Sequence, residues 1–355
     1  MWTFIILVGV LLFITGLIIL FEKLVGAGGE RTITINDETV ISVGGGETAL
    51  NSLSQNKIYL PSACGGKGTC GTCKFRLIEH SEPPKPTEIP YLSEIEIKDG
   101  VRLSCQTKVS NDMKVSLPTS LLNAKTFKGI VTDIQELTYD TKLIRFSLDE
   151  PMEFLPGQYA QILVPGFEED RAYSIASDSK DPKTIEFITR LVPKGVASTY
   201  LVRALDIGDK VRLTGPFGDF YLQEDSQKSI IMIAGGSGKA PIRSIVYRLI
   251  DLGFKREATY FFGARTQKDL YFTEEFLEIA KNHPNFTYVP ALSHANDDEA
   301  WKGEKGLITE VVAKLTGDLK NHEAYLCGSP GMIDACIKVL KSKGMEEKNI
   351  YFDKF

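Results

Sequence analysis

Residues 64–73, CGGKGTCGTC, place three cysteines in a glycine-rich loop, and a fourth cysteine, Cys105, follows after 31 further residues. Four cysteine thiolates are the usual ligand set of an iron–sulfur cluster. The glycines allow the backbone to wrap closely and to aim N–H groups at the sulfurs. A structural zinc site usually shows two Cys-x2-Cys pairs, and only one is present here. The spacing therefore favours a 2Fe–2S cluster over zinc, and over disulfides, which are rare in the cytoplasm.

The spacing and the flanking residues resemble the ferredoxin domain of the plant-type and adrenodoxin-like superfamily, which has a β-grasp fold. The five-residue gap between the first two cysteines is typical of the adrenodoxin-like variant. The resemblance implies that all four cysteines bind the metal of the cluster, namely Cys64, Cys70, Cys73 and Cys105.

The sequence around the cysteines fits a small domain over residues 31–120. Residues 32–43 alternate between apolar and polar side chains around an Asn-Asp turn, which predicts a hairpin. Residues 47–53 predict a short helix, and residues 101–118 predict further strands. Residues 82–90 are rich in proline and glutamate, which suggests a surface loop.

At the N-terminus, residues 2–21 carry no charged side chain. Twenty helical residues span about 30 Å, which is the thickness of the hydrocarbon core of a bilayer. A cleaved signal peptide is the alternative, and the small residues 26–29 keep it open. Against it, no basic residue precedes the stretch, whose length exceeds the usual apolar region of about 7–15 residues. Because Lys23 and Arg31 follow the stretch, the positive-inside rule places the rest of the chain in the cytoplasm.

We therefore predict that residues 1–26 form a single-pass transmembrane anchor in the inner (cell) membrane, with the soluble domains on the cytoplasmic side. The lipid bilayer is then a partner of the chain through one N-terminal helix. The net charge is −5, and no basic run exceeds two residues. A nucleic-acid partner is not expected, because a phosphate-binding surface needs positive charge.

Toward the C-terminus, short strands separated by turn residues predict a small antiparallel barrel within residues 124–225. The predicted strands cover residues 128–135, 142–148, 157–164, 171–176, 184–191 and 209–214. One of them contains the tetrapeptide Arg171-Ala172-Tyr173-Ser174, which by itself is also compatible with an ordinary strand.

A second motif lies downstream, where Gly195-Val196-Ala197-Ser198 forms a turn that opens a predicted helix at residues 197–205. A helix N-terminus binds phosphate through its free N–H groups and its dipole. Together, the tetrapeptide and this turn resemble the ferredoxin–NADP reductase superfamily.

The resemblance implies a flavin site. Arg171 would bind the flavin phosphate, Tyr173 would stack on the ring, and Ser174 would hydrogen-bond near the ring N5, where it would have a catalytic role. The Gly-x-x-Ser turn would hold the pyrophosphate, which favours FAD over FMN.

From residue 229 the pattern changes to an alternation of apolar strands and helices, which predicts a parallel sheet with helices on both faces. The predicted helices cover residues 241–252, 273–282, 308–316 and 330–343, and the last strand covers 349–352. Residues 233–241, IAGGSGKAP, follow a buried strand and open a helix, which is the context of a phosphate-binding loop.

This loop resembles the Gly-Gly-x-Gly-x-Ala-Pro loop of the same reductases, so it implies a nicotinamide dinucleotide site that includes Gly235, Gly236, Ser237 and Gly238. Lys239 departs from the apolar residue expected in the loop. Two interpretations of Lys239 stay open: it adds charge near the phosphates, or it faces solvent.

Arg265 and Asp269 lie in a stretch that cradles the adenosine in relatives that use NADH. The sequence has no Ser/Arg cluster dedicated to a 2′-phosphate, which favours NADH over NADPH. Cys327 and Gly328 resemble the family's loop beside the nicotinamide, and the alternative for Cys327 is a small buried thiol. Phe355 matches by position a C-terminal aromatic residue that covers the flavin, and the alternative is a frayed tail. Cys327 and Phe355 are thus predicted catalytic residues beside Ser174.

The predicted fold class is multidomain, with an N-terminal transmembrane helix, a β-grasp 2Fe–2S ferredoxin domain, an antiparallel β-barrel flavin domain and an α/β parallel-sheet nucleotide-binding domain. The predicted boundaries are 1–26 for the anchor, 31–120 for the ferredoxin domain, 124–225 for the FAD-binding barrel and 229–355 for the NADH-binding domain.

This domain order resembles two groups of the superfamily. One is the soluble reductase component of multicomponent oxygenases. The other is the F-type subunit of sodium-translocating NADH:quinone oxidoreductases, which has one N-terminal anchor. The predicted anchor, the cysteine spacing and the Asp-x-Phe ending favour the second. One departure is that six residues, 165–170, bridge two strands between which the F-type subunit carries a long insertion.

The resemblance implies an enzyme that moves electrons from NADH to FAD, then to the 2Fe–2S cluster, and then to a membrane electron acceptor or other subunits of a membrane complex. In the second group, the whole complex reduces ubiquinone and transports sodium. A non-enzymatic electron carrier with degenerate motifs is an alternative, but the intact motif residues argue against it, namely Arg171, Tyr173, Ser174, Gly236 and Gly238.

Overall fold

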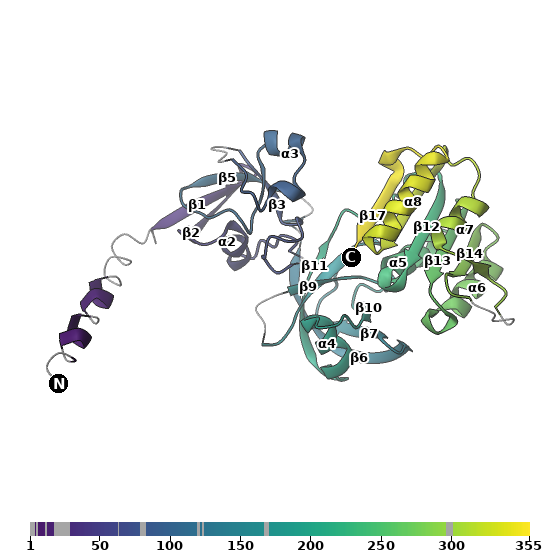
Figure 1. Cartoon of the computed structure of the whole chain (residues 1–355), viewed down its shortest axis with the longest axis horizontal. Helices are drawn as coiled ribbons and strands as arrows, with labels where there is room; N and C mark the ends of the chain where they lie inside the picture. Colours follow the sequence, from purple (N-terminus) through teal and green to yellow (C-terminus); the bar gives the residue numbers. More distant parts are fainter. Residues whose placement is uncertain are drawn as a thin grey trace. The chain divides into compact units, whose positions relative to one another are not determined.

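The computed structural model describes residues 4, 6–10, 13–17, 29–62, 64–78, 83–118, 121–122, 124–166, 170–295 and 301–355. The chain divides into two compact units, Met1–Ala124 and Lys125–Phe355 (Figure 1). No helix within the described part of the chain has both the length and the apolar character needed to cross a bilayer. The predicted span at residues 2–21 lies partly outside the described residues.

The first unit is built on a mixed five-stranded sheet with the order β2-β1-β5-β3-β4. Strand β1 pairs with β5 in parallel, and the other neighbours are antiparallel. The predicted hairpin is confirmed: Asn36 and Asp37 form its turn with φ of 52° and 59°. Asn and Asp tolerate this left-handed conformation better than most residues. The strands are β1 (Glu30–Ile35), β2 (Thr39–Gly44), β3 (Lys74–Leu77), β4 (Val101–Leu103) and β5 (Met113–Ser116).

Helix α2 (Ala49–Gln55) covers this sheet, and the side chain of Thr48 caps it by accepting from the Asn51 N–H. The predicted short helix is thus confirmed, shifted by two residues. The sheet and helix close over an apolar core that includes Ile33, Leu53 and Phe75. Two short helices follow, η1 (Ile89–Tyr91) and α3 (Glu94–Lys98).

The segment rich in proline and glutamate is largely exposed, as predicted, but Glu88 is an exception at 2% exposure. Its carboxylate accepts hydrogen bonds of 2.7 Å from the backbone N–H groups of Lys85 and Leu103. Glu88 therefore ties this segment to the end of β4, two residues before Cys105. The composition of the segment did not reveal that role.

The second unit begins with a barrel whose strand order is β10-β7-β6-β11-β8-β9, with antiparallel pairing throughout. A bridge between Ile175 and Phe187 joins the end of β9 to β10 and closes the barrel. Apolar side chains such as Phe146, Ile162 and Phe187 fill it. Its strands are β6 (Lys125–Thr138), β7 (Thr141–Leu148), β8 (Tyr159–Leu163), β9 (Asp170–Ser174), β10 (Thr184–Arg190) and β11 (Lys210–Phe217).

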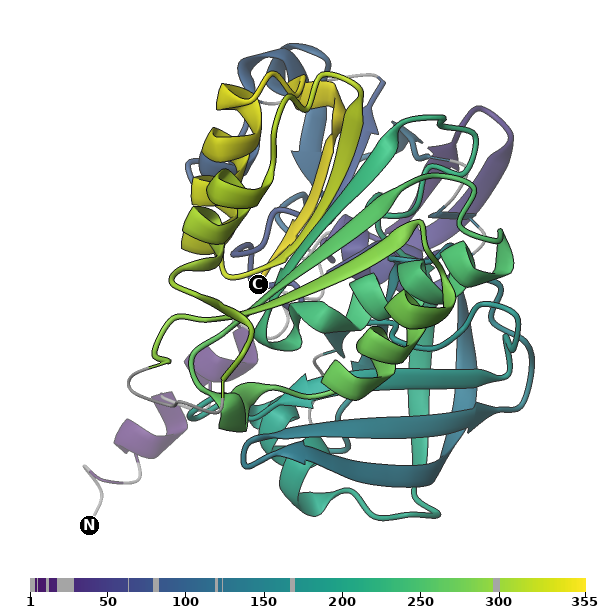
Figure 2. The same ribbon diagram turned by 90° about the vertical axis from the view of Figure 1, so that its right-hand side faces the viewer.

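The barrel leads into a parallel six-stranded sheet with the order β15-β14-β13-β12-β16-β17. Helices cover both faces of this sheet, as the alternating pattern predicts (Figure 2). The strands are β12 (Ser229–Gly235), β13 (Ala258–Ala264), β14 (Phe286–Leu292), β15 (Glu304–Lys305), β16 (His322–Gly328) and β17 (Ile350–Lys354). The helices are α5 (Lys239–Asp251), α6 (Thr273–Asn282), α7 (Ile308–Leu315) and α8 (Pro330–Ser342), with short η4 (Gly236–Gly238), η5 (Gln267–Asp269) and η6 (Glu347–Asn349).

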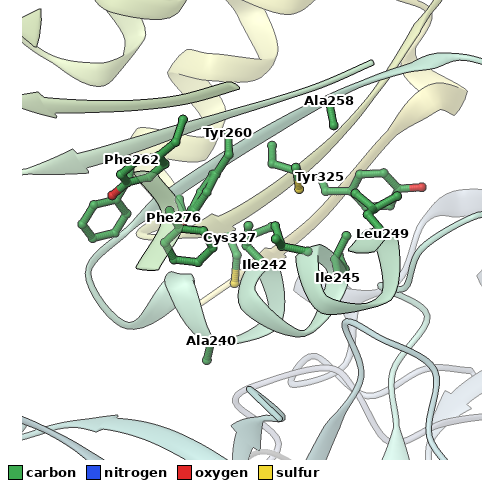
Figure 3. Packing of buried hydrophobic residues seen from close by; sticks show 14 of the residues in the cluster. Ala240, Ile242, Ile245, Leu249, Ala258, Tyr260, Phe262, Phe276, Tyr325 and Cys327 are labelled. Atoms are coloured by element: carbon green, nitrogen blue, oxygen red, sulfur yellow. The ribbon is translucent and has the colours of Figure 1, made fainter. Parts of the chain in front are cut away.

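Successive strand residues point to opposite faces of the sheet, so the two faces have separate cores. Helices α5 and α6 pack on one face, where Ile242, Ile245 and Leu249 lie against aromatic residues that include Tyr260 and Tyr325 (Figure 3). Helices α7 and α8 pack on the other face. The second core contains Cys336, which confirms the prediction that this cysteine is a core residue.

A buried ion-pair network joins the barrel to this sheet. Arg243 of α5 is 7% exposed and donates to Glu186 of β10 at 2.6 Å and to the backbone carbonyl of Ala176 at 3.2 Å. It also pairs with Glu275 of α6 at 3.2 Å. Because removing one partner of a buried pair leaves an uncompensated charge, this network fixes α5 against the end of β9.

Candidate functional site

The four cysteines of the first unit lie in two pairs. The Sγ atoms of Cys64 and Cys70 are 3.4 Å apart. Cys73 and Cys105 hydrogen-bond to each other through their side chains. Both are buried, in a small apolar cluster that also contains Leu92. The loop and the distant cysteine therefore meet as the resemblance requires.

Two loop glycines are required by their surroundings. Gly68 and Gly71 have φ of 72° and 71°. A Cβ atom on Gly68 would lie 2.6 Å from the side-chain nitrogen of Gln106, and one on Gly71 would lie 2.7 Å from the Cβ of Tyr91. Only glycine combines this conformation with such close contacts.

Hydrogen bonds favour the thiolate form in one cysteine of each pair. The bond with Cys73 lowers the pKa of Cys105 to about 6, against the opposing effect of burial. Burial also opposes ionisation of Cys64, but hydrogen bonds with the backbone of Thr69 and with Cys70 lower its pKa to about 7. The partner thiol of Cys73 has a raised pKa, because it is the donor to Cys105 and is buried. The thiolate is the form that binds metals.

The paired sulfurs fit a two-iron cluster. Throughout the described residues, no three His, Cys, Asp or Glu side chains are grouped so that they could hold a single metal ion. A single zinc would need such a group, since it usually has four ligands. A 2Fe–2S cluster instead takes two protein ligands on each of its two irons, which matches the two pairs.

Gln106 contacts the same site, although no sequence motif includes it. Its side-chain Nε2 lies 3.5 Å from the Sγ of Cys105, and its Oε1 accepts from the hydroxyl of Thr87 at 3.1 Å. Lys85 donates to its backbone carbonyl. Gln106 therefore joins the Cys loop to the proline-rich segment. Only its position next to a cysteine could have indicated this.

In the second unit, β9 carries the predicted flavin residues. Arg171, Tyr173 and Ser174 are all half-buried, and Ser174 pairs with Tyr159 of β8. The ring of Tyr173 lies 5.8 Å from that of Phe187, and burial raises its pKa to about 12, so the phenol stays neutral. The structure thus brings the tetrapeptide onto one barrel strand. The roles of its residues toward a flavin stay predictions.

The predicted pyrophosphate turn precedes α4 (Val196–Thr199), which continues as η3 (Tyr200–Ala204). Ser198 is 5% exposed, and its hydroxyl bonds within the turn, to the N–H of Val192 and the carbonyl of Gly195. A side chain on Gly195 would meet that hydroxyl at 2.6 Å. Ser198 therefore shapes the turn, and the backbone N–H groups of Val196 and Ala197 are the groups this turn offers to a phosphate.

The glycines of the nucleotide loop lie between β12 and α5. Gly236 has φ of 58°, and a Cβ on Gly238 would lie 2.1 Å from the carbonyl oxygen of Cys327. A Cβ on Gly235 would lie 2.8 Å from the sulfur of Met332. The loop is thus pressed against the end of β16, where no larger residue fits.

A cavity of about 290 Å³ lies between the barrel and the parallel sheet, where this loop begins. It brings together three predicted residues, Gly236, Arg265 and Asp269. The other residues that line it belong to none of the assigned motifs: Thr138, Asp140, Thr141, Arg190, Gly263, Ala264, Tyr271, Ser293, Leu307, Ile308, Ser329 and Met332.

Arg265 is exposed at the cavity, whereas Asp269 is already occupied within its own turn. The Asp269 carboxylate accepts from the N–H and the hydroxyl of Thr266 at 2.9 and 2.8 Å. Asp269 therefore shapes the wall of the cavity. Its predicted contact with adenosine stays a prediction.

Arg190 is the barrel's charged contribution to the cavity. It pairs with Asp140 at 2.8 Å, and this hydrogen bond raises the pKa of Arg190. The guanidinium lies 3.6 Å from the position of a Cβ on Gly236, so it faces the nucleotide loop. No local motif marks Arg190, because the barrel fold alone brings the end of β10 to this loop.

Cys327 and Phe355 meet at the end of β16. Cys327 is fully buried in the core under α5, and burial raises the pKa of its thiol far above the usual value. Phe355 is 53% exposed, and its N–H donates to the carbonyl of Gly328 at 3.1 Å. The predicted role of Cys327 would require its sulfur to act from beneath the cavity. The roles of both residues stay predictions.

Lys239 fits neither interpretation drawn from the sequence. It is fully buried, with its Nζ 3.6 Å from the centre of the Phe262 ring. The ammonium therefore faces neither solvent nor the cavity. The sequence pattern missed this because the first turn of α5 lies under the aromatic residues of β13 and α6.

Comparison with known proteins identifies each part of the chain. Residues 33–110 match the family model of the 2Fe-2S iron-sulfur cluster binding domain. Residues 128–221 match the oxidoreductase FAD-binding domain, and residues 232–338 match the oxidoreductase NAD-binding domain.

Two kinds of curated relative align with most of the chain. The reductase component of a phenol 2-monooxygenase from Pseudomonas sp. (strain CF600) is 36% identical, with 89% of this chain and 91% of the relative aligned. The F-type subunit of a Na(+)-translocating NADH-quinone reductase from Neisseria meningitidis is 33% identical, with 98% and 97% aligned. Among solved structures, the Amycolatopsis cytochrome P450 reductase GcoB is similar, with a TM-score of 0.76, 30% identity, and coverage of 92% of this chain and 98% of that one.

Proposed function

The chain belongs to the family of reductases that join a 2Fe–2S domain to an FAD-binding and an NAD-binding domain, and we propose that it delivers the electrons of NADH to an acceptor in a membrane. It is an oxidoreductase that uses NADH, FAD and a 2Fe–2S cluster. When bound, FAD supplies hydride acceptance and single-electron release, and the cluster carries one electron at a time.

The cavity of about 290 Å³ carries the assignment of the NADH site. On one side the Gly236–Gly238 turn offers backbone N–H groups at the start of α5, where phosphate binds well. On the other side the guanidinium of Arg190 faces the same turn. The dinucleotide is thus held between the barrel and the sheet, which directs its nicotinamide toward the flavin strand.

Arg171, Tyr173 and Ser174 are proposed to hold the flavin. A guanidinium matches the geometry of a phosphate, and Tyr173 offers an aromatic face that stays neutral because its pKa is raised to about 12. Ser174 offers a hydroxyl at the end of β9, the strand whose following residues Arg243 fixes in place. The proposed domain boundaries are 31–120, 124–225 and 229–355.

We propose Cys64, Cys70, Cys73 and Cys105 as the cluster ligands, one pair for each iron. Ser174, Cys327 and Phe355 are proposed to act at the flavin, with Phe355 covering it until NADH arrives. The hydrogen bond from the N–H of Phe355 to Gly328 supports this, since it keeps the chain end at the nucleotide domain.

The membrane part of the proposal rests on the uncharged stretch at residues 2–21. It is supported by the extent of the alignments, because the quinone-reductase relative aligns with 98% of this chain and the phenol 2-monooxygenase reductase with 89%. We propose an anchor at residues 1–26 in the inner membrane, with the catalytic domains in the cytoplasm. An anchored donor reaches a membrane acceptor at high effective concentration.

A second candidate is the reductase component of an oxygenase. The higher identity of 36% to the phenol 2-monooxygenase reductase favours it, as does the short connection at residues 165–170, which replaces the insertion expected in the quinone-reductase group.

Membranes from cells that express the full chain distinguish the two candidates. After a high-pH wash, we expect the full chain to stay in the pellet and to reduce a quinone at the expense of NADH. A chain without residues 1–26 should move to the supernatant and keep NADH–ferricyanide activity. Full-length protein in the supernatant would support the oxygenase alternative.

A further inference from the structure

Lys239, the residue that follows the nucleotide loop, has no exposed surface. Its Nζ donates to the backbone carbonyl of Tyr271 at 2.5 Å and to the hydroxyl of Tyr288 at 3.2 Å. The rings of Phe262 and Phe276 have their centres 3.6 and 5.1 Å from it. Within the described residues, no carboxylate forms an ion pair with it. Burying such a group is costly unless its hydrogen bonds are made.

Tyr271 returns a hydrogen bond to the same loop. Its hydroxyl donates to the carbonyl of Gly236 at 2.6 Å, and both Gly236 and Tyr271 line the cavity. Lys239 therefore holds the backbone of Tyr271 from one end of the loop, while the Tyr271 side chain holds the other end. We call these two hydrogen bonds, Lys239 Nζ to Tyr271 O and Tyr271 Oη to Gly236 O, the Lys239–Tyr271 clamp.

The residue after Tyr271 shows that this segment is held firmly. Phe272 has φ of 54°, in the left-handed region that a bulky residue rarely adopts. Its ring packs on the guanidinium of Arg243, 4.5 Å away. Such a conformation persists only where its surroundings over-determine it. The connection between β13 and α6 is therefore a fixed support for the nucleotide loop.

We propose that Lys239 is a positioning residue for NADH, acting through the Lys239–Tyr271 clamp on the shape of the Gly236–Gly238 turn. Lys239 does not touch the dinucleotide, because the loop and the aromatic rings separate it from the cavity. Its effect is on the geometry of the N–H groups that receive the phosphates. The proposal rests on the assignment of this cavity to NADH.

The test uses the full-length, flavin-loaded and cluster-loaded protein with the variants Lys239→Met, Tyr271→Phe and the double variant. Methionine can pack among the aromatic rings but cannot donate to the Tyr271 carbonyl. We expect Lys239→Met to raise the KM for NADH about tenfold, the effect of one or two lost hydrogen bonds. The kcat with ferricyanide should stay within about twofold, because the flavin strand is unchanged.

Three comparisons make the result specific. Because both hydrogen bonds act as one unit, the double variant should be no worse than the stronger single variant. The KM ratio of variant to wild type should not change with salt, since a buried group is little screened. The matched control is Lys343→Met, which removes a lysine that donates to the carbonyl of Thr316, outside the residues that line the cavity; its KM should equal that of wild type.

An unchanged KM in Lys239→Met, or strictly additive effects in the double variant, would overturn the clamp. If Lys239→Met loses its flavin or unfolds, Tyr271→Phe alone decides, because it removes only one hydroxyl. Failure of the proposed function is a different result: the wild-type protein itself would then not oxidise NADH.

Discussion

The cysteine site of the first unit and the nucleotide cavity of the second are built in different ways. Three of the four cysteines lie within ten residues, and the fourth is fixed by two short strands. The cavity instead collects residues from position 138 to position 332 of the sequence. A site made by one loop can be recognised from spacing, whereas a site made by several strand ends depends on how the strands pack.

The largest expected effect breaks the first site and leaves the second intact. Cys73→Ser removes a buried sulfur that pairs with Cys105. We expect complete loss of the 2Fe–2S signal in electron paramagnetic resonance after chemical reduction, because a cluster needs all four ligands. NADH–ferricyanide activity should persist through the flavin. The control Cys336→Ala, in the core of the second unit, should keep the cluster signal.

The second effect breaks the cavity and spares the cluster. In Gly238→Ala, the new Cβ would lie 2.1 Å from the carbonyl of Cys327, so the loop must move. A misplacement of about 1 Å lowers turnover roughly 100-fold, and we expect this loss in flavin reduction by NADH. The reduced cluster signal with dithionite should be unchanged. Gly317→Ala, at a glycine with open space around it, is the matched control, and equal losses in both variants would contradict the account.

Arg190 separates electrostatic from geometric contributions to the cavity. Arg190→Met removes an exposed cation that faces the nucleotide loop. We expect the KM for NADH to rise about tenfold at low salt, as for one lost charge-assisted bond. The difference from wild type should shrink at high salt, since exposed charges are screened. A salt-independent effect would mean that Arg190 acts by shape, as we propose for Lys239.

The smallest effect concerns the tuning of the cysteine site. Gln106→Leu removes an amide that lies 3.5 Å from the sulfur of Cys105. Hydrogen bonds to the sulfurs affect the potential of a cluster, and a lost donor disfavours the reduced, more negative form. We expect the midpoint potential to fall by up to about 59 mV, a tenfold change for one electron. Titration monitored by electron paramagnetic resonance measures it, and Thr87→Val, which loses only the contact to Gln106, should show a smaller shift.

The sequence predicted the strands and helices well where the pattern is periodic. It placed the hairpin with Asn36 and Asp37, the barrel strands and the helices on the parallel sheet. These elements follow from local alternation and turn residues, which need no knowledge of distant contacts.

The failures all involve side chains whose environment comes from distant segments. Glu88 sits in a segment with the composition of a surface loop, yet it is buried because Leu103 offers a backbone N–H. Lys239 has the charge of an exposed residue, yet aromatic residues of β13, α6 and β14 enclose it. Arg190 carries no motif, and only closure of the barrel brings it to the loop. Such contacts cannot be derived from the local pattern.

The central claim is that electrons pass from NADH through the flavin to the cluster held by the four cysteines. Anaerobic titration of the full chain with NADH, followed by visible and electron paramagnetic resonance spectra, tests it most directly. We expect the flavin to bleach first and the reduced 2Fe–2S signal to appear as more NADH is added. Flavin bleaching without any cluster signal, even after chemical reduction, would contradict the assignment of Cys64, Cys70, Cys73 and Cys105.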